Sequence, residues 1–140
     1  MAEIIIEDND FVTLWFHTDG GIVHHKVKPV NPPYSQHYRT LFRSTLMKGV
    51  ALLRERGAIK WLSEDTDSIE IPPKDVAWGQ EEWAPKAIIS GWRYWAMVIP
   101  KDMMAKMNSG NIGRRLSSRG VTLNVYSSVV EAFDWLRSIG

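Results

Sequence analysis

The chain has 140 residues and contains no cysteine, which excludes disulfide bonds, thiolate metal sites and cysteine nucleophiles. Its 17 basic and 16 acidic residues nearly cancel, so neither a nucleic-acid-binding surface nor an acidic tail is expected. No apolar run approaches the roughly 20 residues of a membrane span, and the first residues lack the pattern of a signal peptide. We therefore expect a single cytoplasmic domain covering residues 1–140.

The first part of the chain has the pattern of β-strands. Residues 3–7 form a short apolar run between acids, and two further apolar segments flank the sequence TDGG. Asp19-Gly20 is a strong hairpin signal because glycine adopts positive φ without steric cost. Residues 3–27 are therefore predicted to be strands with a hairpin at TDGG.

Two adjacent histidines, His24 and His25, lie in this region. Neighbouring side chains of a strand point to opposite faces, so the two rings cannot easily bind one metal ion. His17 could lie near one of them across the hairpin, but without a carboxylate or cysteine partner the zinc signal is weak. We therefore predict surface or edge-strand histidines and no metal site.

The segment from Ser35 to Arg56 is the clearest helix, because its apolar residues recur at helical spacing and form one stripe. Ser35 can cap its N-terminus and Gly57 can end it. A buried strand over residues 58–62 is predicted to follow.

The second half of the chain alternates between helices and strands. Pro85 cannot lie inside a helix without losing a backbone hydrogen bond, so two separate helical pieces are predicted around it. A hairpin followed by four strand–helix units predicts an α/β fold with a mainly parallel mixed sheet and helices packed on it. The elements predicted here are helical pieces at about 74–82 and 84–90, a strand at 92–99, an interrupted helix from 101 to Gly120, a strand at 121–127 and a final helix after Ser128.

An acidic segment, residues 63–70, contains four carboxylates and three hydroxyls directly after the predicted buried strand. Ligands of parallel α/β sheets bind at the carboxyl ends of the strands, which makes this segment a candidate site. A phosphorylation switch, a cation site and a solvated turn remain open. The neighbouring carboxylates would repel phosphate and the glycine of a calcium loop is absent, so the solvated turn is favoured. The candidate regulatory residues are Ser63, Asp65, Thr66, Asp67 and Ser68.

The seven tryptophans are the best evidence for an interaction surface, since tryptophan is enriched at interfaces. Trp78 and Trp83 are five residues apart, or about 140° around a helix, and cannot share one narrow stripe. Trp78, Trp83 and Trp92 are therefore candidates for an interface or an apolar groove. The alternative is that the break at Pro85 turns Trp83 into the core.

Three stretches of the sequence, KGVALLRERGAIKWLSED, WGQEEWAPKAIISGWRYWAMVIP and RGVTLNVYSSVVEAFDWL, carry a resemblance to a known family. Over about residues 20–138 the chain resembles the small bacterial proteins of the SpoIIAA-like superfamily, which are labelled STAS-like or CRAL-TRIO-like. The resemblance implies a superhelix of four βα units behind an N-terminal hairpin. Its better-known members divide between phosphorylation-switched protein-binding modules and lipid carriers, and most small bacterial members have no assigned biochemistry, so the resemblance does not choose a function. Asp67-Ser68 is similar to the phosphorylated region of such modules, but their Ser-Gly-Leu continuation is absent here.

No nucleophile elbow, phosphate-binding loop or dinucleotide fingerprint occurs in the sequence. We therefore expect a non-enzymatic binding module without a cofactor, acting on a protein partner or on a second copy as a homodimer in a regulatory setting. The alternative is a carrier or sensor of a lipid or another apolar small molecule, held between sheet and helices. A hydrolase or metal-dependent enzyme at the carboxyl edge is the remote alternative.

Overall fold

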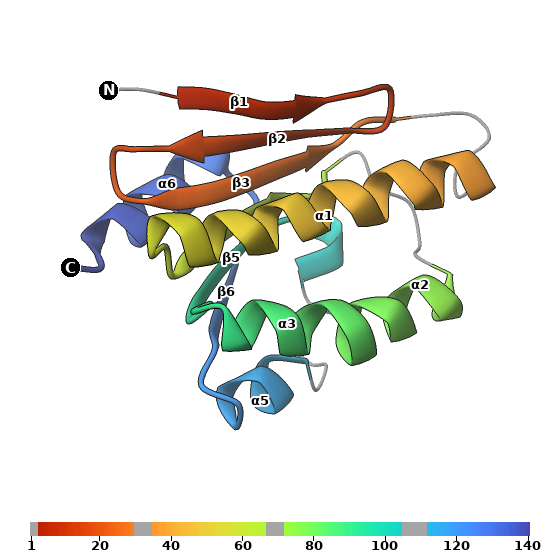
Figure 1. The fold of residues 1–140 in the computed structure, drawn as a ribbon. Helices are drawn as coiled ribbons and strands as arrows, with labels where there is room; N and C mark the ends of the chain where they lie inside the picture. Colours follow the sequence, from red (N-terminus) through yellow and green to blue (C-terminus); the bar gives the residue numbers. More distant parts are fainter. Residues whose placement is uncertain (1–2, 30–34, 67–71, 105–111) are drawn as a thin grey trace.

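A computed structural model of the chain describes residues 3–29, 35–66, 72–104 and 112–140. Its six strands form one sheet in which the spatial order follows the order along the chain (Figure 1). The first three strands pair antiparallel, and the pairs from the third strand to the sixth are parallel. The predicted α/β fold with an N-terminal hairpin and four βα units is confirmed. The strands are β1 (Glu3–Asp8), β2 (Val12–His17), β3 (Ile22–Val27), β4 (Lys60–Glu64), β5 (Tyr94–Val98) and β6 (Thr122–Tyr126).

Helices cover both faces of this sheet. Each parallel connection steps to the next strand in the same direction, and right-handed crossovers then place the connecting helices on one face. The last helix packs on the opposite face, over a second core cluster. The helical elements are α1 (Gln36–Arg56), α2 (Pro73–Trp78), η1 (Gly79–Trp83), α3 (Ala84–Ile89), η2 (Lys101–Met103), α5 (Ile112–Ser117) and α6 (Val129–Ser138).

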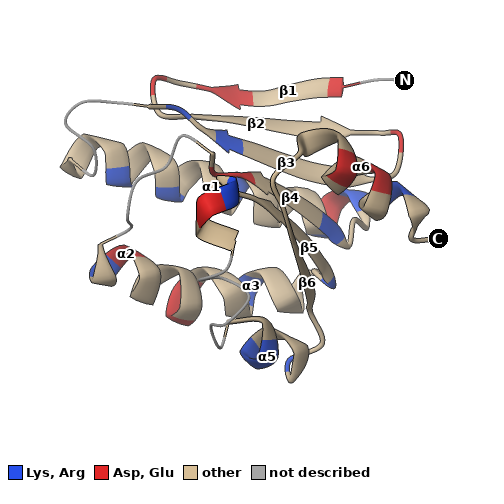
Figure 2. Cartoon of the chain, turned by 180° about the vertical axis from the view of Figure 1, so that it is seen from behind, with Lys and Arg blue, Asp and Glu red and all other residues tan. Residues whose placement is uncertain are grey.

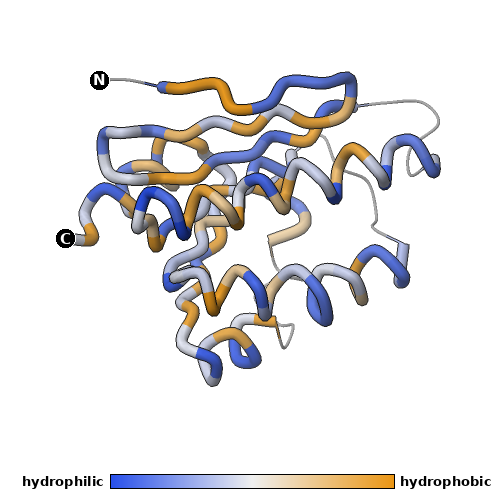
Figure 3. The backbone as a smooth tube through the Cα atoms, in the orientation of Figure 1, coloured by the Kyte–Doolittle hydropathy of each residue, from blue (hydrophilic) through white to orange (hydrophobic). Residues whose placement is uncertain are grey.

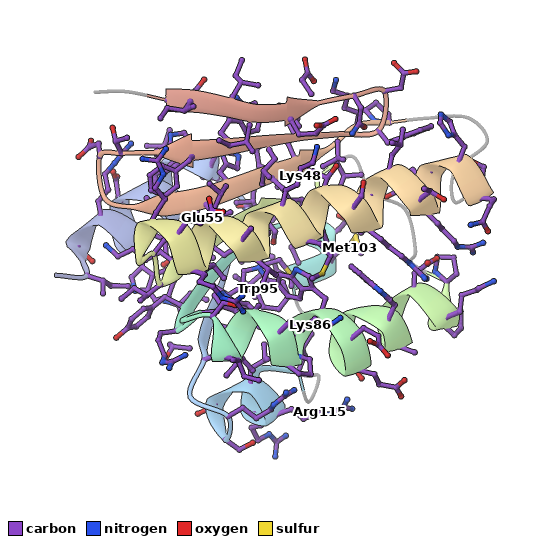
Figure 4. All side chains as sticks on the ribbon, viewed as in Figure 1. Lys48, Glu55, Lys86, Trp95, Met103 and Arg115 are labelled. Carbon is purple, nitrogen blue, oxygen red and sulfur yellow. The ribbon has the colours of Figure 1, made fainter. Side chains whose placement is uncertain are left out.

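The long helix α1 has the ends that the sequence predicts. The Ser35 hydroxyl accepts a hydrogen bond from the Tyr38 N–H at 3.0 Å, and Gly57 ends the helix with φ of +62°. On its sheet side, Gly49 leaves room for the indole of Trp61, which is fully buried beneath it. Lys48 reaches from α1 toward the N-terminal strands, where its ammonium lies 2.5 Å from a carboxylate oxygen of Glu7 (Figure 4).

The strand predicted at 58–62 lies two residues further along the chain, at Lys60–Glu64. It continues through polar residues because both its edges are paired: Ser63 lies opposite His25 of β3 on one side and Met97 of β5 on the other. A segment paired on both sides keeps its backbone hydrogen bonds only as a strand. The first two residues of the predicted acidic turn are therefore strand residues.

The prediction of two separate helical pieces around Pro85 is wrong, because α2, η1 and α3 follow one another without a gap. The middle segment, η1, is a π-helix in which the Ala84 N–H donates to the carbonyl of Gly79. This wider turn accommodates the proline, whose missing N–H would otherwise interrupt the helix. The strand predicted from Trp92 begins instead at Tyr94, since Gly91 turns the chain with φ of +120°.

Apolar residues gather on the strands and on the helix segments next to them, whereas α2 is mostly hydrophilic (Figure 3). No helix in the described part of the chain combines the length and apolar character that crossing a bilayer requires.

Candidate functional site

Polar side chains gather at the carboxyl end of β4 and the adjoining part of β3, on both faces of the sheet. Side chains alternate between the faces, so His24 and Glu64 lie on the α6 side and His25 and Ser63 on the α1 side. His24, His25, Ser63 and Glu64 are all buried. The prediction of surface or edge-strand histidines is therefore wrong, because β3 is an interior strand paired on both sides.

On the α6 side, two histidines and a carboxylate follow one another. His17 Nε2 lies 3.0 Å from His24 Nδ1, which confirms the expected proximity across the hairpin. His24 Nε2 lies 3.3 Å from Glu64 Oε1, although the contact lacks good hydrogen-bond geometry. The His24 ring stacks on Trp15 at 4.4 Å and meets the edge of Phe133 from α6 at 5.3 Å.

Burial in this arrangement disfavours the charged form of both histidines. Burial lowers the pKa of His24 below its usual value, against the opposing effect of the Glu64 carboxylate. Burial, together with the charge of His24, also lowers the pKa of His17. Burial acts to raise the pKa of Glu64, but the close contact with His24 and the charge of Lys26 outweigh it and lower that pKa. Glu64 is therefore a carboxylate, compensated in part by Lys26 at 3.7 Å.

On the α1 side, His25 lies between an indole and a carboxylate. The Trp61 Nε1–H donates to His25 Nδ1 at 2.9 Å, which leaves the proton of the neutral ring on Nε2. His25 Nε2 lies 3.6 Å from Asp65 Oδ1. The ring nitrogens of both His24 and His25 thus face protein groups. These rings join neighbouring strands and are not presented to a substrate as general bases.

The candidate regulatory residues are separated by the structure. Ser63 is 1% exposed, and its hydroxyl accepts a hydrogen bond from the Trp95 indole at 2.7 Å. The prediction of Ser63 in a regulatory loop is therefore wrong, because a kinase cannot reach a hydroxyl buried in a paired strand. Asp65 lies just after β4, and Thr66 is exposed. Asp67 and Ser68 lie outside the described residues.

The cation interpretation of the acidic segment gains no support from the part of it that is described. Glu64 and Asp65 lie on opposite faces of the sheet, where they contact His24 and His25 respectively. Within the described ranges, no three histidine or carboxylate side chains gather closely enough to hold a metal ion.

The three candidate interface tryptophans are also separated. Trp83 is 8% exposed and Trp92 is fully buried, both within the core on the α1 side. The π-helix turns Trp83 inward, where its ring meets Trp61 at 5.0 Å and Trp92 at 4.8 Å. The prediction of an interface or apolar groove is therefore wrong for these two residues. Trp83 lies in the core, as the alternative expects, although the helical segment does not break at Pro85. Trp78 is the member that remains partly exposed.

Trp78 belongs to a second polar cluster, the arginine bridge, which consists of Arg39, Arg43, Asp75 and Trp78 and joins α1 to α2. Arg39 Nε lies 3.0 and 3.1 Å from the two oxygens of Asp75, and Arg43 Nη2 lies 2.9 Å from Oδ1. The Arg43 guanidinium also lies over the Trp78 ring at 5.1 Å from its centroid. Basic positions of α1 accordingly face an acidic position on α2 (Figure 2).

The sequence contains one signal for the arginine bridge, which is the spacing of its two arginines on α1 and is not part of a known motif. Two arginines four residues apart on a helix lie on the same face, and here that face carries Arg39 and Arg43. Asp75 is predicted only to be near a helix start, where its carboxylate meets the helix dipole. Its pairing with residues more than 30 positions earlier depends on the packing of α1 beside α2.

No protein-family model, curated protein or solved structure matches this chain. The resemblance to the SpoIIAA-like superfamily therefore stays a prediction.

Proposed function

We propose that the chain is a non-enzymatic binding module that takes a protein partner at the arginine bridge. The observation that carries this proposal is the exposed position of α2. None of its six residues is buried, yet it presents a partly exposed tryptophan held by an arginine. Tryptophan and arginine are the residue types that most often dominate the binding energy of protein interfaces.

The polar network in the sheet supports this choice over catalysis. His24 and His25 direct both ring nitrogens at groups of the protein, so they stabilise strand pairing. The arginine bridge lies at the surface instead, with the side chains of Arg39 and Arg43 exposed to 19% and 31%.

Site-specific photo-crosslinking in native cells tests the proposal. A photo-reactive phenylalanine derivative replaces Val76 on α2, which is 41% exposed, and the matched control replaces Val130 on α6, which is 68% exposed. We expect a specific adduct from position 76 only, and an adduct with a second copy would identify the partner as the chain itself. The same adducts from both positions would contradict the proposal.

The purified partner then allows a quantitative test. Trp78→Ala should weaken its affinity by about tenfold or more, as expected for an interface hot spot. Val130→Ala should leave the affinity unchanged. Circular dichroism must show that Trp78→Ala remains folded, because Trp78 also packs against the core on one side. Unchanged affinity in a folded Trp78→Ala protein would refute the proposal.

A further inference from the structure

The hydrogen-bonding capacity of the arginine bridge is mostly unused. In the part of the chain that the structure describes, Arg39 donates to Asp75 only through Nε, and Arg43 donates only through Nη2. Arg43 Nε is buried and has no hydrogen-bond partner among the described residues. Because each guanidinium carries five N–H donors, a single carboxylate leaves most of both groups unpaired. The bridge therefore has cationic donors in excess, and its charge is +1.

The geometry indicates which anion would use this excess. Another carboxylate carries no more charge than Asp75 and competes with a group already held close by its own chain, whose effective concentration is high. A phosphoryl group carries a charge of about −1.5 to −2 and three acceptor oxygens, so it can pair with both guanidinium groups together. It therefore outcompetes Asp75 where a carboxylate does not.

Displacing Asp75 has a small structural cost. Asp75 lies in the first turn of α2, and none of the residues of α2 is buried, so a shift of that turn removes little apolar surface from the core while Trp78 at the other end of the helix stays packed against it. Displacement is also required, because a phosphoryl group beside the Asp75 carboxylate would be repelled by it. A phosphoryl group can therefore pair with Arg39 and Arg43 only after Asp75 has left them.

We propose that Arg39 and Arg43 form a phosphoryl-binding site, occupied by Asp75 in the free protein, that receives a phosphorylated side chain of the protein partner. This inference rests on the proposed function and specifies the chemistry of the partner.

Arginine-selective ¹⁵N NMR tests the inference directly, since the Nε–H groups of Arg39 and Arg43 report on the site. Their signals are assigned with Arg39→Lys and Arg43→Lys, and Arg114 on α5 serves as the control. The probes are a neutral peptide with one phosphoserine, the same peptide with glutamate in that position, and inorganic phosphate. We expect only the phosphoserine peptide to bind with useful affinity and to shift the Arg39 and Arg43 signals without moving that of Arg114.

Variants of the bridge sharpen this test. Asp75→Asn removes the internal competitor and should tighten phosphopeptide binding by about tenfold or more, because the ion pairs of Asp75 with Arg39 and Arg43 no longer have to be broken. Arg39→Lys or Arg43→Lys should weaken binding by a similar factor, because lysine keeps the charge but lacks the planar fork. Absence of any Arg39 or Arg43 shift in both wild type and a folded Asp75→Asn protein would overturn the inference.

The remaining outcomes each have a defined meaning. Equal binding of the glutamate peptide would overturn the assignment to phosphoryl, and equal binding of inorganic phosphate would overturn the assignment to a protein side chain. The partner identified by crosslinking can also be treated with phosphatase. If the dephosphorylated partner still binds the wild-type chain but binds Trp78→Ala more weakly, the phosphoryl inference fails while the proposed binding module stands.

Discussion

The contact between Gly49 and Trp61 allows a test of how tightly α1 is fitted to the sheet. A Cβ atom at position 49 would lie 2.2 Å from Trp61 Cη2 and under 3.0 Å from two further ring carbons. Carbon atoms pack at about 3.5–4.0 Å, so the indole would have to move by more than about 1 Å. It cannot do so freely, because it is fully buried, hydrogen-bonded to His25 and in contact with Trp83.

The expected magnitude for Gly49→Ala follows from two opposing terms. Overpacking a core typically costs about 1–3 kcal/mol, and three close ring contacts place this site at the upper end. Alanine has a higher helix propensity than glycine, which stabilises the helix by about 1 kcal/mol. The net result should be a loss of about 2 kcal/mol in the free energy of unfolding. Urea unfolding followed by circular dichroism measures it as a lower midpoint.

Gly79→Ala is the matched control, since Gly79 has helical backbone angles and no heavy atom within 4 Å of an added Cβ. It should raise the free energy of unfolding by about 0.5–1 kcal/mol, because only the conformational freedom of the unfolded chain changes. An unchanged or higher midpoint for Gly49→Ala would refute the claim that Trp61 is held rigidly beneath α1.

Three further predictions concern the sheet and its last helix. The pKa values of His17 and His24 are lower in the folded protein than in the unfolded chain, so the unfolded chain binds protons at a higher pH. The urea midpoint should therefore fall as the pH drops below about 6.5, the ordinary pKa of histidine. His24→Gln should reduce this pH dependence. Ser128→Ala removes the N-terminal cap of α6 and should cost about 1 kcal/mol, measured as a lower Tm. Ser63→Asp should abolish cooperative unfolding instead of mimicking a phosphorylation switch, because it buries a carboxylate in β4; a folded, soluble variant would contradict this.

The features that the sequence predicts correctly are those with local causes. The TDGG turn and the helix ends at Ser35 and Gly57 depend on residues within a few positions of one another, and each is present in the structure. The order of strands and helices follows from the same local signals together with the rule for crossover handedness.

The predictions that fail depend on partners far away in the sequence. Ser63 looks like a loop residue because it is polar and precedes acids, but Trp95 supplies the donor that allows it to be buried. His25 is likewise buried because Trp61, 36 residues later, donates to its ring. Pro85 remains inside a helical segment because Gly79–Trp83, just before Ala84, form a π-helix. No simple sequence pattern in these five residues predicts a π-helix.

His25 and the arginine bridge differ in how fully their polar groups are satisfied, and this difference supports the proposed binding surface. At the carboxyl ends of β3 and β4, His25 accepts a hydrogen bond from an indole and faces a carboxylate, so both of its ring nitrogens are used within the protein. In the arginine bridge, one carboxylate pairs with two guanidinium groups, and Arg43 Nε has no hydrogen-bond partner in the described part of the chain. A saturated network contributes stability and specificity to the fold, whereas a network with donors in excess gains free energy when an anion arrives. The excess of donors therefore supports the proposal that recognition takes place at α1 and α2, where Asp75 lies in the first turn of a helix with no buried residue.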